Sequence, residues 1–179
     1  MPTSSDRLAL LFSSLGHMLM HMLAAFFFVI VLVLETEWDL PYHELIQLWT
    51  LGALLIGLCA LPAGWLADRW SAPGMIAIMF VGMGVACLLC SAADSPQALF
   101  VGLSILGVFA SIYHPVGIPW VVRNASAGGR ALGINGVFGG LGVALSGGVA
   151  GLLIDLAGWR AAFAIPGMVS LLCGVSLAL

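Results

Sequence analysis

The stretch LPAGWLADRWSAPG, Leu61 to Gly74, carries the only acid and the only base between Glu44 and Asp94. The residues before it (44–66) and after it (74–92) are almost entirely apolar. An α-helix needs about 20 apolar residues to cross a bilayer, and each run has about that length. The stretch therefore predicts a short polar connector between two transmembrane helices.

The same alternation of apolar runs and short polar connectors continues through the chain. The apolar runs cover 8–34, 44–66, 74–92, 98–122, 131–156 and 161–179. The 179 residues are 62% hydrophobic and only 7% charged, whereas soluble domains carry about 25% charged residues. A soluble fold of this size could not bury so much apolar surface. The sequence predicts an all-α membrane protein with six transmembrane helices.

Arginine placement predicts the orientation of these helices. Arg7, Arg69, Arg123 and Arg130 fall on one side of the predicted membrane, and only Arg160 falls on the other. Cytoplasmic connectors carry an excess of basic residues, so we expect a cytoplasmic N-terminus and a multi-pass protein of the bacterial inner membrane. The arginines are scattered and lysine is absent, which argues against nucleic acid as a partner.

The connector contains a pattern of a known transporter family. Residues 64–69, GWLADR, resemble the G-x-L-A-D-R signature that the major facilitator superfamily carries between helices 2 and 3. Gly64 permits close helix approach, and Asp68 precedes the positive N-terminus of the next helix. The resemblance implies that Gly64, Asp68, Arg69 and Arg130 belong to a cytoplasmic gate. Ser71 to Pro73 depart from the pattern, because a glycine and basic residues usually follow.

The rest of the chain supports the same resemblance. Residues 158–167, GWRAAFAIPG, resemble the common entry into helix 6 of the superfamily. The resemblance implies the N-terminal six-helix half of a twelve-helix facilitator, built from two inverted three-helix repeats. The sequence stops within an apolar run, so we expect a missing C-terminal half. We expect three partners: the lipid bilayer, a small-molecule substrate, and either the C-terminal half or a second copy of the chain.

Two further segments are similar to the fosmidomycin-resistance family within that superfamily. SLGHMLMHML, 14–23, and GVFASIYHPVG, 107–117, are followed by NASAGGRALG, 124–133. The matching positions are Ser14, His17, Tyr113, His114, Pro115, Ala125, Ser126, Gly128, Gly129 and Arg130. Characterised members of that family are drug exporters driven by the proton-motive force. His21 stands where those relatives often have an acid, and Leu103 where the superfamily often has an arginine.

The histidines are the principal candidates for the transport pathway. His17 and His21 are one turn apart and share a helix face. At 1.5 Å per residue, His17 and His114 lie about 14 and 12 Å from the cytoplasmic edge, so we expect them to face one cavity. Ionisable groups at such depth usually mark a substrate or proton pathway. Tyr113 and Asn135 are further candidates.

Other interpretations of these residues stay open. The histidines could form hydrogen bonds between helices, and Tyr113 and Asn135 could do the same. A metal ion could also bind to His17, His21 and His114. The leading expectation, however, is that the protein has no metal ion or other cofactor. The methionines at 18, 20 and 22 spread around the helix and are expected to pack rather than to bind metal.

Prolines and glycines mark expected breaks and contacts. Pro115 and Pro119 each remove a backbone donor, so we expect a helix break or gate there. The small-xxx-small spacing of the glycines in the fifth run predicts close helix packing. The glycines concerned are Gly136, Gly140, Gly147 and Gly151.

Together these features predict a secondary active transporter that moves a small solute or drug by alternating access. Proton-coupled efflux is one form that this transport could take. A metal or metal-chelate transporter that uses the histidines is one alternative. A scaffold or sensor that keeps the fold without transport is another. We do not expect an enzyme, because the sequence has neither HExxH nor GxSxG.

Overall fold

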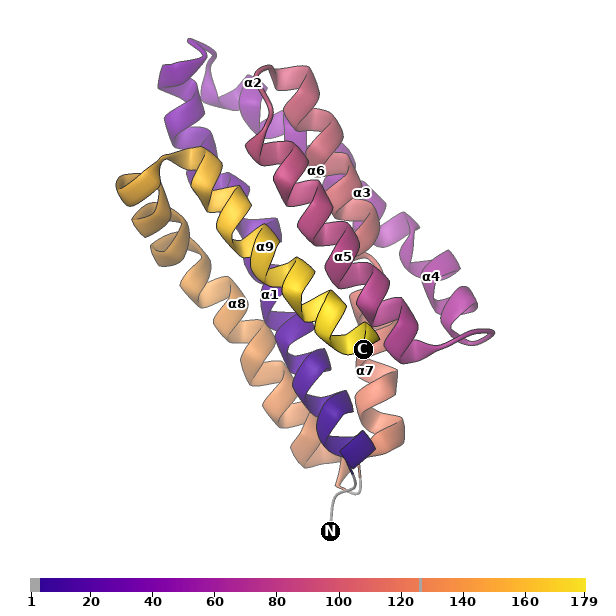
Figure 1. Cartoon of the computed structure of the whole chain (residues 1–179). Helices are drawn as coiled ribbons and strands as arrows, with labels where there is room; N and C mark the ends of the chain where they lie inside the picture. The colour runs from indigo at the N-terminus through magenta and orange to yellow at the C-terminus, as the bar shows by residue number, and fades with distance from the viewer. Residues whose placement is uncertain (1–3, 126) are drawn as a thin grey trace.

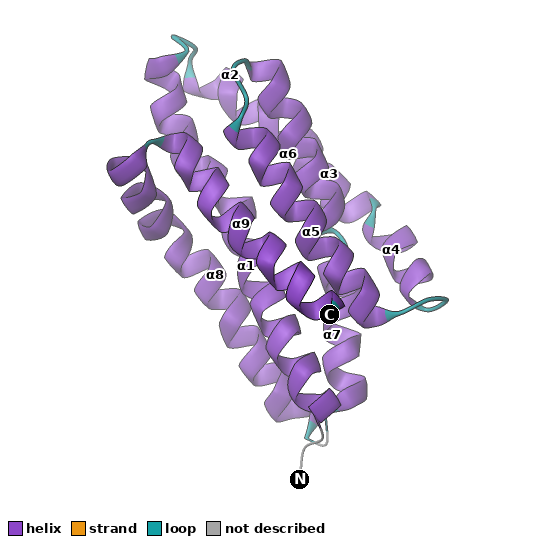
Figure 2. Cartoon of the chain, in the orientation of Figure 1, coloured by secondary structure: helices purple, strands orange, loops and turns teal. Residues whose placement is uncertain are grey.

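The structure of the chain is a computed structural model that describes residues 4–125 and 127–179. Every regular element in these two ranges is a helix (Figure 2). Ser126, a member of the loop pattern after the fourth apolar run, lies outside the described residues. The all-α prediction is confirmed.

Six apolar helical segments of the described chain are long enough to cross a membrane (Figure 1). They cover Ser5–Glu37, Tyr42–Ala67, Ala72–Ser91, Pro96–Asn124, Gly128–Ala157 and Trp159–Ala178. The elements that build them are α1 (Ser4–Glu37), α2 (Tyr42–Ile46), the 3-10 helix η1 (Gln47–Trp49), α3 (Thr50–Leu58), α4 (Ala60–Ala67), α5 (Ala72–Ser91), α6 (Pro96–Ala110), α7 (Tyr113–Asn124), α8 (Gly128–Ala157) and α9 (Trp159–Ala178). The prediction of six apolar helices is confirmed.

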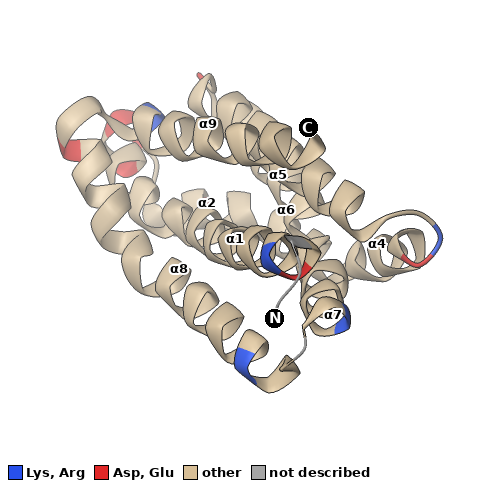
Figure 3. Ribbon diagram, turned by 60° about the horizontal axis from the view of Figure 1, so that its bottom comes forward, with Lys and Arg blue, Asp and Glu red and all other residues tan. Residues whose placement is uncertain are grey.

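Charged residues gather at the helix ends and leave the middle of the bundle uncharged (Figure 3). Arg7 lies in the first turns of α1, Arg123 near the end of α7 and Arg130 near the start of α8. A charge in the hydrocarbon core costs several kcal/mol, so this distribution suits a bilayer around the middle of the bundle. The side of the membrane on which the N-terminus lies stays a prediction.

Chemical labelling can test that orientation. Ala127 is exposed at the start of α8. In an Ala127→Cys variant, we expect the new thiol to react with a membrane-impermeant maleimide only after cells are permeabilised. The exposed Glu44→Cys position, in α2, should react in intact cells. The unsubstituted chain is the control, because its four cysteines are free thiols. The reverse labelling pattern would place the N-terminus outside.

The bundle is organised around two helix pairs. α1 packs along α8, and α5 packs along α9, while α7 and α6 join these pairs to the second span. Phe26 and Phe27 of α1, Phe80 of α5 and Phe163 of α9 are all fully buried. Gly52 of α3 lies against α6 so closely that an added Cβ would lie 2.7 Å from the backbone oxygen of Leu103. Small residues at such crossings allow backbones to approach in a membrane.

The glycines of α8 lie on two different faces of the helix. A Cβ added at any of the four predicted packing positions, Gly136, Gly140, Gly147 and Gly151, would meet no atom within 4 Å. The close contacts with α1 are made instead by Gly139 and Gly142, which are buried. The mean directions of the two sets differ by about 120° around the helix axis. Within the described residues, the close contact with α1 is thus made by the face that carries Gly139 and Gly142, and close packing by the four predicted glycines stays a prediction.

A polar tether joins the ends of three spans at the opposite end from the N-terminus. The indole Nε1 of Trp159 donates a hydrogen bond to Glu37 over 2.7 Å. Arg160 donates to Glu37 over 3.3 Å and to the Ala93 carbonyl over 3.0 Å. Its guanidinium also lies 4.3 Å from the centre of the Trp159 ring. These contacts hold the end of α1, the α5–α6 connector and the start of α9 together.

Candidate functional site

A polar cluster lies where α1, α7 and α8 meet. It consists of His17 and His21 on α1, Tyr113 and His114 at the start of α7, and Asn135 on α8, and we call these five residues the histidine cluster. All five are pathway candidates from the sequence, and the structure brings them into contact.

An interruption of the fourth span positions Tyr113 and His114. α6 ends at Ala110 and α7 begins at Tyr113. Pro115 has no N–H to donate to the carbonyl of Ser111, which weakens the helix at this point. The interruption therefore lies before Pro115, whereas α7 continues through Pro119. Pro115 also contacts the second span, since a Cβ at Gly64 would lie 3.3 Å from its Cβ.

The ring of His17 is packed between Tyr113 of α7 and the backbone of α8 at Gly139. Tyr113 stacks on one face, with ring centroids 4.6 Å apart and an interplanar angle of 23°. Gly139 lies against the ring as well, because a Cβ there would come within 2.5 Å of Cε1 and Nε2. Only glycine leaves room for the imidazole at this position of α8. Sequence reasoning missed Gly139, because nothing along α8 shows which glycine faces α1.

Hydrogen bonds fix the edge of the same ring. The Nδ1 atom of His17 lies 3.0 Å from both the main-chain oxygen and the side-chain Oδ1 of Asn135. A main-chain carbonyl can only accept, so Nδ1 carries a hydrogen and donates it. In the neutral imidazole, the free lone pair is then on Nε2.

Asn135 also binds Tyr113. Its Nδ2 lies 2.8 Å from the Tyr113 hydroxyl and donates to it, while the hydroxyl lies 3.0 Å from Oδ1. Tyr113 is 0% exposed and Asn135 is 2% exposed. This pair links α7 to α8 and, through His17, to α1. The alternative that these residues serve helix–helix hydrogen bonding is therefore compatible with the geometry.

The three imidazoles of the cluster form a compact group. The ring centroid of His17 lies 5.0 Å from that of His21 and 5.4 Å from that of His114, and the last two are 5.5 Å apart. One nitrogen from each ring can be chosen so that all three lie within 4.8 Å of one another. His17 and His21 are half-buried and His114 is exposed, so the cluster is reached from the His114 side.

Two serines of α1 lie beside the cluster. Ser13 donates a hydrogen bond from its hydroxyl to the carbonyl of Gly117, over 3.2 Å, and thereby joins α1 to α7. Ser14, a member of the pattern in the first apolar run, has a buried Oγ with no hydrogen-bond partner among the described residues.

Arg130 lies apart from the other three residues of the expected cytoplasmic gate, Gly64, Asp68 and Arg69. Arg69 donates to the carbonyl of Trp65 over 3.2 Å, and its guanidinium lies 4.0 Å from the centre of the Trp65 ring. Neither Asp68 nor Arg69 forms an ion pair with another residue of the described ranges. Figure 3 shows the α4–α5 connector well away from the start of α8, where Arg130 lies.

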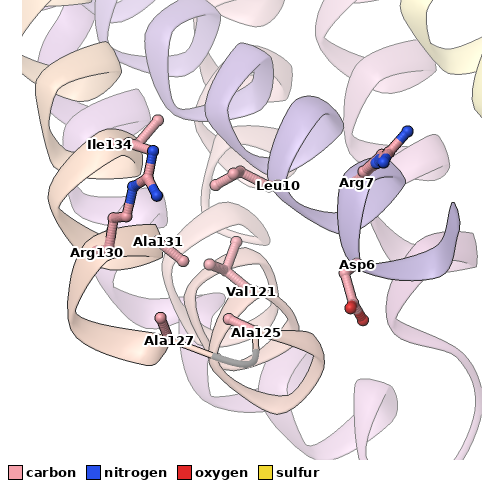
Figure 4. A pocket seen from close by; sticks show the side chains of 9 residues that line it. All are labelled: Asp6, Arg7, Leu10, Val121, Ala125, Ala127, Arg130, Ala131 and Ile134. Carbon is pink, nitrogen blue, oxygen red and sulfur yellow. The ribbon is translucent and has the colours of Figure 1, made fainter. Parts of the chain in front are cut away.

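Arg130 instead lines a pocket of about 300 Å³ between α1, α7 and α8. Figure 4 shows Arg130 on one side of this pocket and Asp6 and Arg7 of α1 on the other. Val121 and Ile134 contribute to its apolar wall.

The sequence from residue 11 to residue 179 matches the sequence model of the Major Facilitator Superfamily. The chain belongs to the major facilitator superfamily. This family consists of membrane transporters, and the six apolar helices make this facilitator a multi-pass membrane protein. The superfamily resemblance is confirmed, and the closer resemblance to the fosmidomycin-resistance family stays a prediction.

Two proteins illustrate the similarity. The facilitator chain is 30% identical over 139 residues to "Puromycin resistance protein pur8" of Streptomyces alboniger, across 75% of this chain and 28% of that protein. The POT family transporter PepTSo, in a structure determined in meso, aligns with a TM-score of 0.75 and 16% identity, over 99% of this chain and 37% of that chain. The second similarity shows the fold alone. The facilitator chain thus spans less than two thirds of either protein's length.

Proposed function

We propose that this chain is the N-terminal six-helix bundle of a secondary active transporter that moves a small solute or drug by alternating access. The observation that carries the proposal is the histidine cluster. Five polar side chains from three helices converge within the bundle, and His17 lies near the middle of α1. Polar and ionisable groups in a membrane are costly and usually mark a pathway.

The proposed substrate and coupling ion follow from two different observations. The similarity to a protein named for puromycin resistance supports a drug as substrate and export as direction. The three imidazoles support coupling to protons, because imidazole changes its charge near neutral pH. The proposed activity is therefore proton-coupled export from a bacterial cytoplasm. We also propose that the N-terminus lies inside the cell and that the protein is a member of the fosmidomycin-resistance family.

The proposed partner is the C-terminal half of the same transporter. The second and fifth spans are the least buried, with 17% and 22% of their apolar windows inside the bundle, against 50% for the first span. The four open glycines of α8 lie on such an uncovered surface. The chain covers 28% and 37% of the two relatives, which supports a second set of helices as the cover.

A transport assay tests the role of the cluster. In proteoliposomes that contain the full-length protein, we expect puromycin transport driven by a pH gradient to fall several-fold in His114→Ala. His114 is exposed, so its loss should alter the pathway without unfolding the bundle. His17→Ala should reduce transport as well, because the stacked ring of His17 forms the centre of the cluster.

His43→Ala is the matched control, since His43 is exposed in α2 and lies outside the cluster. It should transport puromycin like the unsubstituted protein. Thermal unfolding of each variant separates lost transport from lost fold. Unchanged transport in both His17→Ala and His114→Ala would rule out the cluster as part of the pathway.

A further inference from the structure

We propose that His17, His21 and His114 form a binding site for one divalent late transition-metal ion, such as Cu²⁺ or Zn²⁺. The ion would be held by three imidazole nitrogens, with a further position open on the exposed side of His114. The proposal concerns ion binding by these residues. It goes beyond solute transport and can fail while the proposed transport function stands.

The His17 ring already has the hydrogen-bonded state that a metal ligand needs. Its Nδ1 donates to the main-chain oxygen of Asn135, 3.0 Å away, which leaves the lone pair of the neutral ring on Nε2. Metal-binding histidines almost always donate their other nitrogen to a carbonyl or carboxylate in this way. The Tyr113 ring and Gly139 hold the plane of the imidazole. One ligand is therefore already oriented.

The three imidazole rings are crossed with respect to one another. The interplanar angles are 42° between His17 and His21, 88° between His17 and His114, and 67° between His21 and His114. The lone pairs lie in the ring planes, so rings stacked in parallel could not direct them at one point. Crossed rings can do so.

The distances require only a small closure of the group. One nitrogen from each ring already lies within 4.8 Å of the other two. Bond lengths of about 2.0–2.1 Å to zinc imply nitrogen–nitrogen distances of about 3.3–3.6 Å, so the widest nitrogen pair must close by at most about 1.2–1.5 Å. His21 is half-buried and His114 is exposed, which leaves both side chains room to rotate by that amount.

The donor set selects the class of ion. The described group contains three imidazoles and no carboxylate. Imidazole suits copper, zinc and nickel, whereas magnesium and calcium prefer oxygen ligands. Three protein ligands with an open position are typical of zinc sites that accept an exogenous ligand. The exposed His114 also gives the ion a path of entry without opening the bundle.

The test is a Cu²⁺ titration of the purified full-length protein, carrying an affinity tag without histidine. We expect one equivalent of Cu²⁺ to bind, with nitrogen hyperfine splitting in its electron paramagnetic resonance spectrum. His21→Ala and His114→Ala should each weaken this binding by more than about tenfold, because loss of even an outer hydrogen-bond partner of a ligand costs 10- to 100-fold. Excess Mg²⁺ should not compete.

His43→Ala is again the control, because it removes a histidine outside the cluster. Its Cu²⁺ affinity should equal that of the unsubstituted protein, and thermal melts should show that each variant is folded. The proposal is overturned if no stoichiometric Cu²⁺ binds, if binding survives both His21→Ala and His114→Ala, or if Mg²⁺ displaces the Cu²⁺. Transport by a variant that has lost Cu²⁺ would leave the proposed function intact.

Discussion

Replacing Gly142 with leucine is expected to push α8 away from α1 and to prevent the bundle from folding stably. A Cβ at this position would run into the main-chain carbonyl oxygen of Met18 and would lie 3.0 Å from its Cα. A backbone cannot rotate aside as the end of a side chain can. Overpacking by single methylenes already costs about 1–3 kcal/mol, and leucine adds four carbons. The α1–α8 contact also brings Asn135 to His17.

Circular dichroism of the purified 179-residue chain in detergent checks this prediction. Gly142→Leu should show a strongly lowered melting temperature or no cooperative transition. Gly140→Leu is the matched control, two residues away on α8, where an added Cβ meets no atom within 4 Å. Its melt should resemble that of the unsubstituted chain. Equal destabilisation by the two substitutions would contradict the assignment of the packing face.

The positions of the spans could be predicted because lipid leaves the backbone few choices. A segment in hydrocarbon must satisfy its own N–H and C=O groups, so a long apolar run becomes a helix. The sequence does not show the interruption at Cys59, between α3 and α4, as a break in hydropathy. It lies one turn before Pro62, which cannot donate to the carbonyl of Leu58.

The rotation of each helix about its axis was harder to predict. In water, an apolar face identifies the side that packs, but in a membrane both the packed and the lipid-facing sides are apolar. The spacing of Gly136 and Gly140 therefore indicates a face suited to close packing, but it does not show which neighbouring helix that face contacts. The same limit explains why Gly139, which makes room for His17, could not be recognised.

The histidine cluster was easier to predict than the gate. The depth of a residue in the membrane follows from counting residues along its helix. His17 and His114 lie on helices that run in opposite directions, and counting places the two residues at similar depth. That reasoning needs only two helices to be neighbours, as α1 and α7 are. The expected gate residues Asp68, Arg69 and Arg130 lie at or beside connectors, and connector conformation does not follow from hydropathy.

Replacing Asn135 with leucine is expected to destabilise the bundle through the Tyr113 hydroxyl. Leucine keeps the approximate shape of asparagine but cannot bind this hydroxyl, which is fully buried. His17 keeps its bond to the main-chain oxygen of residue 135, so its ring stays in place. An unsatisfied buried donor costs about 1–3 kcal/mol. Hydrogen bonds between membrane helices reach at most about 1.7 kcal/mol in mutant cycles, so we expect a loss of about 1–1.7 kcal/mol.

A double-mutant cycle separates this cause from a simple packing defect. Tyr113→Phe removes the hydroxyl but keeps the ring that stacks on His17. Replacing both polar partners by apolar groups of similar shape can be nearly neutral. The variant with both Asn135→Leu and Tyr113→Phe should therefore be more stable in thermal melts than Asn135→Leu alone. If the two losses simply add, the hydroxyl was not the source of the cost, and the cluster is held by ring packing against Gly139 instead.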